Sequence, residues 1–126
     1  MSDRIVLEPT AEHPITIEPI KGRVQVRVNG EVVADTSAAL QLQEATLRAV
    51  QYIRLADVVQ ERLTRTGTST YCPFKGEASY YSVTTSAGDT VDDVIWTYEN
   101  PYPAVAAIAG HVAFYPDKAE ISVLPS

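Results

Sequence analysis

Residues 70–81 (TYCPFKGEASYY) bring together more reactive and aromatic side chains than packing alone requires. They contain the only cysteine of the chain, Cys72, and Lys75 follows three residues later across a Pro-containing turn. A cysteine becomes a nucleophile or redox centre when nearby positive charge stabilises its thiolate, and Lys75 can supply that charge. His111 is the candidate base if the fold brings it close. In the simpler alternative, Cys72 is a small buried apolar side chain and Lys75 reaches solvent.

The aromatic residues suggest a second kind of site, a cleft for a small ligand. Trp96 and Tyr98 lie two residues apart and share one face of a strand, whereas Tyr80 and Tyr81 must point to opposite faces. A cleft with aromatic walls and charged groups at its edge suits a planar or cationic small molecule. Alternatively, the rings only form the core between two sheets. The candidate ligand-binding residues are Tyr71, Lys75, Tyr81, Trp96, Tyr98 and Glu99, with His111 as a further candidate.

Two residues of this region have both a structural and a functional interpretation. Gly76 is expected to adopt a positive φ in the turn before a strand. Lys75 at the rim of a cleft can hold a carboxylate or a phosphate as a point charge.

The chain offers few ligands for a metal ion. A structural zinc site needs four Cys or His ligands in paired spacing, and the chain has one Cys and two His, His13 and His111, without a CxxC motif. The acids Asp92, Asp93 and Glu99 are more simply explained as a solvated turn and strand face. We therefore expect neither a metal nor a cofactor.

The composition predicts one soluble globular domain. With 126 residues, 45% hydrophobic and 21% charged, the chain is long enough to bury a core without disulfides. No apolar run approaches the roughly 20 residues that span a bilayer, and no apolar signal segment is found near the start. A single cysteine fits a reducing compartment. We expect a cytoplasmic protein that does not bind membranes.

The net charge of −6 is unevenly distributed. Residues 21–75 hold eight basic side chains against five acids, and the rest of the chain holds two against eleven. An acidic protein is a poor general binder of nucleic acid, so no nucleic-acid partner is expected. The basic part of the chain is interpreted either as a local patch facing an anionic metabolite or as an ordinary solvated face.

Alternating apolar residues predict that most elements are strands. Val24, Val26 and Val28 alternate with polar residues and are followed by Asn29-Gly30, which favours a hairpin turn with a strand returning over residues 31–35. A second hairpin is predicted over residues 78–85 and 91–98, and further strands over 50–54, 112–115 and 119–124. Residues 38–50 fit either a strand or a helix.

The segments between these strands are predicted as an N-terminal arm, a linker and two short helices. The prolines of residues 1–20 favour an arm or edge strand ahead of a domain at 21–126. Asp57 and Gln60 resemble a capping box that opens a helix through Leu63. A polar linker is expected over residues 64–69, and a second helix over 104–109, ending at Gly110.

Four blocks of the sequence resemble the family known as domain of unknown function 427 (DUF427). They are residues 13–19 (HPITIEP), 32–42 (VVADTSAALQL), 70–81, and 96–101 with 108–115 (WTYENP, IAGHVAFY). The resemblance implies a mainly β, single β-tent-like domain of the Mss4-like kind, with two antiparallel sheets and two short helices. A nucleotidyltransferase-like label is also attached to the family, but no Gly-Ser followed by paired acidic metal ligands is present here.

Three functions follow from these observations. The first is a module that binds an unknown small molecule in the aromatic cleft. The second is an enzyme that uses Cys72 as nucleophile or redox centre, with Lys75 lowering its pKa and His111 as base. The third is an interaction module without pocket chemistry, such as a homodimer joined through its N-terminal arm by β-augmentation.

Overall fold

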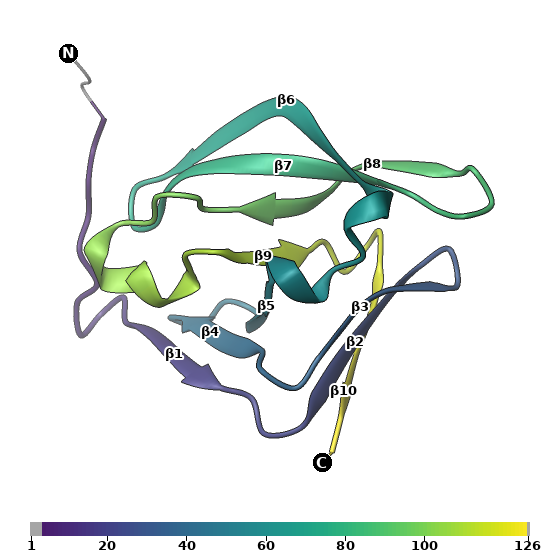
Figure 1. The fold of residues 1–126 in the computed structure, drawn as a ribbon. Helices are drawn as coiled ribbons and strands as arrows, with labels where there is room; N and C mark the ends of the chain where they lie inside the picture. Colours follow the sequence, from purple (N-terminus) through teal and green to yellow (C-terminus); the bar gives the residue numbers. More distant parts are fainter. Residues whose placement is uncertain (1–3, 126) are drawn as a thin grey trace.

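The computed structural model describes residues 4–125, and the regular secondary structure of this part consists of β-strands and a few short 3₁₀ segments (Figure 1). The strands form two antiparallel sheets, which confirms the predicted fold class. In chain order the strands are β1 (Ile15–Pro19), β2 (Arg23–Val28), β3 (Glu31–Thr36), β4 (Leu40–Glu44), β5 (Val50–Arg54), β6 (Leu63–Cys72), β7 (Gly76–Thr84), β8 (Thr90–Thr97), β9 (His111–Phe114) and β10 (Glu120–Leu124).

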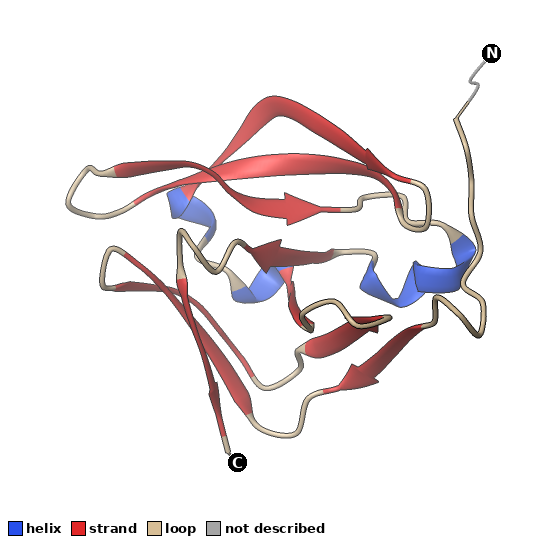
Figure 2. Cartoon of the chain, turned by 180° about the vertical axis from the view of Figure 1, so that it is seen from behind, coloured by secondary structure: helices blue, strands red, loops and turns tan. Residues whose placement is uncertain are grey.

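The larger sheet has seven strands in the order β1-β4-β5-β9-β8-β7-β6. Its edges are β1 and β6, so the Pro-containing segment near the N-terminus is an edge strand, paired with β4. The smaller sheet has the order β10-β2-β3. In Figures 1 and 2 this sheet, which ends next to the C-terminus, leans at an angle against the larger one.

The hairpin of β2 and β3 turns at Asn29 and Gly30, as predicted. Both residues have positive φ, 49° and 83°, which is the requirement of a type I′ turn. The ambiguous residues 38–50 contain the strand β4, because Leu40 and Leu42 direct their side chains to one buried face.

Two predictions for the segments between the strands are wrong. Instead of a capped helix at 57–63, the chain makes two single 3₁₀ turns, η1 (Leu55–Asp57) and η2 (Gln60–Arg62). Asp57 does not cap a helix, because its carboxylate accepts hydrogen bonds from Thr36 Oγ1 at 2.6 Å and Arg54 Nε at 2.9 Å.

The predicted linker at 64–69 belongs to the edge strand β6. Its threonines are held by Asp93, which accepts hydrogen bonds from Thr66 Oγ1 at 2.7 Å and Thr68 Oγ1 at 2.6 Å. The second predicted helix is found as the 3₁₀ segment η3 (Pro103–Ile108), in which Val105 and Ile108 are buried.

The buried residues form two separate hydrophobic clusters. The first cluster fills the space between the two sheets and is rich in valine, with Val24, Val26 and Val28 fully buried. The second cluster lies on the other face of the larger sheet and is rich in tyrosine. Consecutive residues of one strand can serve different clusters: Tyr52 belongs to the second and Ile53 to the first.

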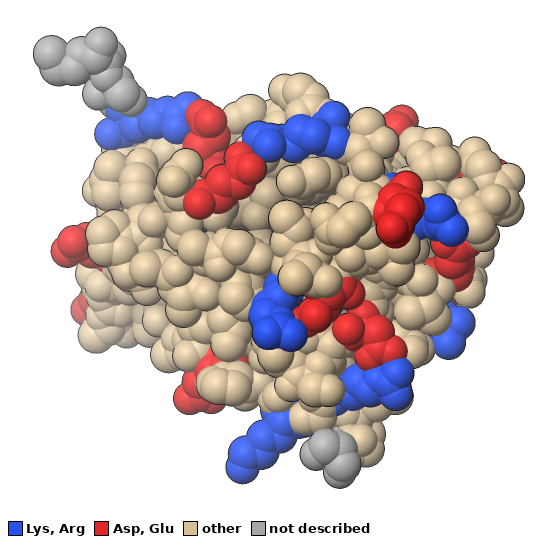
Figure 3. Space-filling view, viewed as in Figure 1, with Lys and Arg blue, Asp and Glu red and all other residues tan. Residues whose placement is uncertain are grey.

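Most of the basic side chains between residues 21 and 75 form ion pairs. Figure 3 shows basic and acidic groups next to each other across one face of the molecule, as expected for a solvated surface rather than a basic patch. The pairs in the described part of the chain include Arg23–Asp35, Arg54–Asp57, Arg62–Glu31, Arg65–Glu99 and Lys75–Glu44.

Candidate functional site

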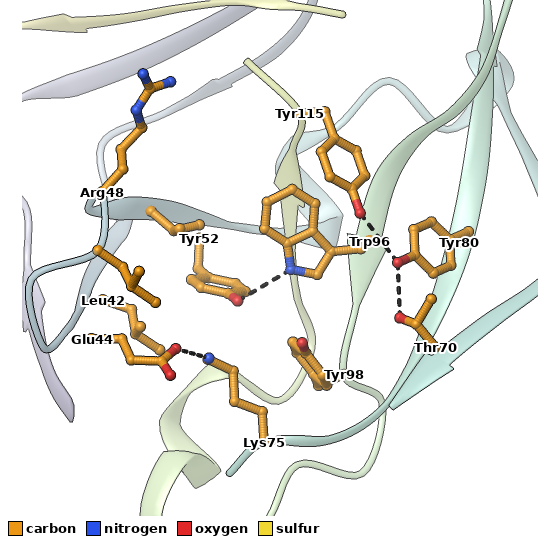
Figure 4. A pocket seen from close by; sticks show the side chains of 12 residues that line it. Leu42, Glu44, Arg48, Tyr52, Thr70, Lys75, Tyr80, Trp96, Tyr98 and Tyr115 are labelled. Carbon is orange, nitrogen blue, oxygen red and sulfur yellow. Dashed lines mark hydrogen bonds and ion pairs between the residues drawn. The ribbon is translucent and has the colours of Figure 1, made fainter. Parts of the chain in front are cut away.

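A pocket of about 260 Å³ opens beside the second cluster, and five of its twelve lining residues are aromatic (Figure 4). Its lining comes from the strands β4, β5, β6, β7 and β8 and from the segments that follow β4, β6, β8 and β9, so distant parts of the sequence meet here. The lining residues are Leu42, Glu44, Leu47, Arg48, Val50, Tyr52, Thr70, Lys75, Tyr80, Trp96, Tyr98 and Tyr115.

One wall holds a nearly buried ion pair between Lys75 and Glu44, whose side chains are only 10% and 13% exposed. Lys75 Nζ donates to Glu44 Oε1, and the other carboxylate oxygen, Oε2, lies 2.7 Å from His13 Nε2. The His13 ring stacks on Phe74 with 4.3 Å between ring centroids. Burial alone would raise the pKa of Glu44, but the hydrogen bonds from Lys75 and His13 outweigh it and hold that pKa below its ordinary value.

The backbone of the β6–β7 turn fixes Lys75 at this wall. Its N–H donates to the Cys72 carbonyl oxygen at 3.2 Å, and its carbonyl oxygen accepts from the Tyr102 N–H at 3.0 Å. Gly76 has the expected positive φ of 111°. A Cβ at this glycine would lie 3.4 Å from the Asn100 carbonyl oxygen, so the two chain segments approach closely here.

Trp96 lies at the centre of the aromatic wall. Its indole Nε1 donates to the Tyr52 hydroxyl at 3.3 Å, and its ring contacts Tyr115 with 4.5 Å between centroids. Burial raises the pKa of Tyr52 to about 12, although the hydrogen bond from Trp96 acts in the opposite direction. Tyr52 is therefore a neutral phenol at physiological pH.

A chain of hydroxyl groups continues the wall on the far side of Trp96. The Tyr80 hydroxyl shares hydrogen bonds with Thr70 Oγ1 at 2.9 Å and with the Tyr115 hydroxyl at 3.2 Å. Burial and the hydrogen bond with Tyr80 raise the pKa of Tyr115 well above its usual range. These polar tips are paired with one another, which fixes the rings in place.

Of the ligand-binding residues expected from the sequence, the structure brings Lys75, Trp96 and Tyr98 together in this pocket. Tyr81 points to the opposite face of β7 from Tyr80 and packs against the first cluster, as strand alternation requires. Glu99 is paired with Arg65 at 2.8 Å on the exposed surface and does not line the pocket.

Tyr71 lies outside the pocket, under the N-terminal segment. Its hydroxyl donates to the Ile5 carbonyl oxygen at 2.6 Å and shares a hydrogen bond of 2.7 Å with the Tyr102 hydroxyl. The Arg4 guanidinium lies 4.5 Å from the centroid of its ring.

The catalytic candidates are only partly brought together. Cys72 Sγ lies 3.9 Å from Lys75 Nζ, and the cysteine is half-buried against the second cluster. His111 is at the start of β9, where its Nδ1 lies 2.9 Å from the Ala109 carbonyl oxygen, and it does not line the pocket. The geometry therefore provides a cation beside the thiol but shows no contact between the thiol and His111.

Sequence reasoning missed several lining residues, including Glu44, Arg48 and Tyr52. A signal for two of them exists in the alternation of strands. Side chains two residues apart on a strand point to the same face. Glu44 therefore shares the face of Leu40 and Leu42, and Tyr52 shares the face of Val50. No local pattern marks Arg48, because a loop brings it to the pocket.

Within residues 4–125, no group of three or more His, Cys, Asp or Glu side chains is arranged to hold a metal ion. In the same part of the chain, no helix has both the length and the apolar character needed to cross a membrane.

The fold and the pocket define a small antiparallel β protein with an aromatic cavity on one face of its larger sheet. The sequence profile of DUF427, described as a domain of unknown function, matches residues 16–124. The chain belongs to this family, as the four sequence blocks indicated. No curated protein matches the sequence.

Proposed function

We propose that this protein is a binding module for a small organic molecule, which occupies the aromatic pocket. The observation that carries the proposal is a cavity of about 260 Å³ that the surrounding rings leave unfilled, with an ion pair at one wall. Ligand sites are concave and mostly apolar, with a few placed polar groups. Sites for drug-sized ligands occupy roughly 300–1,000 Å³, so the size of this cavity favours a ligand of one or two rings.

The pocket contains its own spectroscopic probe, because Trp96 is the only tryptophan of the chain. In a protein labelled with nitrogen-15, the indole N–H gives a single resonance. We expect members of a panel of one- and two-ring metabolites to shift this resonance in a saturable way. A panel in which no compound shifts it would contradict the proposal.

A matched pair of variants tests the location of the site. Leu47 is 56% exposed and lines the pocket, so Leu47→Tyr places a larger, aromatic side chain there without disturbing the core. Leu124 is 39% exposed and lies outside the pocket, so Leu124→Tyr is the control. We expect binding to weaken in the first variant only; equal weakening in both would exclude this pocket.

A second candidate function is an enzyme that uses Cys72, and the observation that favours it is the 3.9 Å approach of Lys75 Nζ to the thiol sulfur. Cys72→Ser separates the two candidates. A binding module keeps its affinity for the compounds found in the panel, whereas an enzyme with a cysteine nucleophile still binds but no longer converts them. Conversion of a panel compound by the wild type, lost in Cys72→Ser, would establish the second function.

A further inference from the structure

The pocket is lined by a tyrosine, Tyr98, whose hydroxyl group has no protein partner in the described part of the chain. The Tyr98 side chain is 8% exposed and lines the pocket, yet no hydrogen bond joins its hydroxyl to another residue in the described part of the chain. Figure 4 shows this hydroxyl pointing into the space below Trp96. Burial raises the pKa of Tyr98 far above its ordinary value, so the group is an O–H donor at neutral pH.

A second donor is available in the neighbouring phenol. The Tyr52 hydroxyl accepts the hydrogen bond of the Trp96 indole, and no acceptor for the proton of Tyr52 itself is found within residues 4–125. Tyr52 is 1% exposed, so bulk solvent does not reach most of its surface. A buried donor left without an acceptor costs stability, which a ligand oxygen in this position would recover.

Lys75 has donor capacity left as well. Its ammonium group carries three protons, of which Glu44 takes one and the sulfur of Cys72, at 3.9 Å, offers a weak acceptor for another. Glu44 is more fully engaged, since its Oε1 accepts from Lys75 and its Oε2 lies 2.7 Å from His13 Nε2. The charged wall of the pocket therefore has unused donors, whereas both oxygens of its one carboxylate already have a partner.

The charge at the entrance favours an anion. Arg48 is exposed at the pocket mouth, and no ion pair or hydrogen bond connects it to the rest of the described chain. With Arg48 and Lys75 against Glu44, the lining has one positive charge in excess. A guanidinium group can bind a carboxylate through two parallel hydrogen bonds.

The apolar part of the lining sets the shape of the ligand. Trp96 and Tyr115 present ring surfaces, and Leu42 lies on the other side of Tyr52 from Trp96 (Figure 4). Flat rings stack on such surfaces with little loss of conformational entropy. The ligand must also carry a hydrogen-bond acceptor at the end that lies next to Lys75, Tyr52 and Tyr98.

Building on the proposed function, we propose that the ligand is a planar aromatic carboxylate of one or two rings. Its ring lies against Trp96 and Tyr115, and its carboxylate accepts hydrogen bonds from Tyr98, Tyr52 and Lys75, while Arg48 attracts it at the entrance. With this assignment we favour an anionic ligand over the cationic ligands that the aromatic residues alone would also suit.

Three probes of one shape and different charge test the assignment: 2-naphthoate, 2-naphthamide and 2-naphthyltrimethylammonium. Titrations into the full-length protein are followed through the Trp96 indole resonance and by calorimetry. We expect 2-naphthoate to bind at least tenfold more tightly than either of the others. If the amide or the ammonium compound binds as well or better, the charge assignment is wrong and the proposed function stands. If none of the three binds, the pocket does not take a flat two-ring ligand, and both proposals fail for this class.

Variants identify the groups that recognise the carboxylate. Tyr98→Phe keeps the ring but removes the free donor, so we expect 2-naphthoate to bind roughly tenfold more weakly, with a smaller effect on the amide. Tyr102→Phe, outside the pocket, is the matched control. Arg48→Glu reverses the entrance charge and is compared with Lys21→Glu, an exposed site outside the pocket. A carboxylate preference unchanged in both Tyr98→Phe and Arg48→Glu would overturn the assignment.

Discussion

At the scale of single residues, the ion pair between Glu44 and Lys75 dominates the site. Both side chains are almost removed from water, so each charge has lost most of its hydration and depends on the other. Such a pair is weak evidence for stability by itself, but removing one partner leaves a buried charge without compensation. The pair therefore affects stability most when only one of its two residues is replaced.

We expect Lys75→Met to lower the free energy of unfolding by about 3 kcal/mol, because it leaves the Glu44 carboxylate facing only His13. The double variant Glu44→Leu/Lys75→Met removes both charges and should recover most of this loss. Urea denaturation of the wild type, the two single variants and the double variant measures the coupling. Additive effects of the two substitutions would show that the pair does not interact.

The same pair predicts a pH dependence. Because the pKa of Glu44 is lower in the folded state than its unfolded value of 4.5, Glu44 contributes stability that is complete above pH 4.5 and is lost as the pH falls through the folded pKa. The free energy of unfolding of Glu44→Gln should therefore fall less steeply with acid than that of the wild type. Urea titrations between pH 7 and pH 3 measure the difference; parallel curves would contradict it.

At the scale of elements, two glycine turns determine how the smaller sheet closes. Gly30 has a positive φ in the β2–β3 hairpin, but a Cβ there would meet no atom within 4 Å. Gly22 has a φ of 122°, and a Cβ there would lie 2.3 Å from the Leu124 carbonyl oxygen of β10. The first glycine is needed for its backbone conformation only, and the second also for the close approach of two chain segments.

Gly30→Ala should therefore cost about 1 kcal/mol of stability, the strain of a left-handed conformation. Gly22→Ala should cost clearly more, because the backbone of β10 must move as well. Guanidinium denaturation followed by circular dichroism compares the two variants. Equal losses of stability in the two variants would mean that the backbone of β10 can shift at Leu124 without a measurable energetic cost.

The strands could be predicted from the sequence better than the segments between them. Alternating valines and Asn29-Gly30 are local signals, and the structure follows them. The helix expected at Asp57 failed because the carboxylate has partners in Thr36 and Arg54, of which Thr36 is 21 residues away. The linker expected at 64–69 is a strand held by Asp93, about 25 residues further on. Long-range hydrogen bonds of this kind leave no local pattern.

At the scale of the whole molecule, the N-terminal segment crosses the turn next to the pocket. The Leu7 N–H donates to the Pro73 carbonyl oxygen at 2.9 Å, and Arg4 pairs with Glu77 at 2.6 Å. By contrast, residues 15–19 are the strand β1, which pairs with β4 along its length. Deleting residues 1–20 would therefore remove a strand from the larger sheet.

We expect removal of residues 1–10 alone to change stability by only about 1–2 kcal/mol, since the Arg4–Glu77 ion pair, the Leu7–Pro73 backbone hydrogen bond and the Tyr71–Ile5 hydrogen bond all lie at the surface. The same variant tests the alternative of a homodimer joined through the arm. A dimer in the full-length protein that becomes a monomer after this deletion, measured by light scattering, would support β-augmentation through the arm. A second variant that lacks residues 1–20 shows, for comparison, how much stability is lost when β1 is removed as well.

The candidate site was predictable only in part, because it is assembled across the whole chain. Lys75, Trp96 and Tyr98 stand out by residue type, and the pocket contains all three. Glu44 is 31 residues from Lys75 along the sequence, and no local pattern associates them. The aromatic residues Tyr71 and Tyr81 are of the expected type, but the register of their strands directs them elsewhere.

The division of the interior into two clusters has a consequence for evolution. The valine-rich cluster between the sheets makes up much of the core, whereas the tyrosine-rich cluster surrounds the pocket. The side chains of the two clusters lie on opposite faces of the larger sheet, so the effects of substitutions in different clusters should be close to additive where the sites are well separated. Residues that line the pocket can therefore be exchanged while the valines between the sheets continue to stabilise the domain. If the pocket binds a ligand as proposed, proteins with this scaffold can then differ in the ligand while they keep the same core.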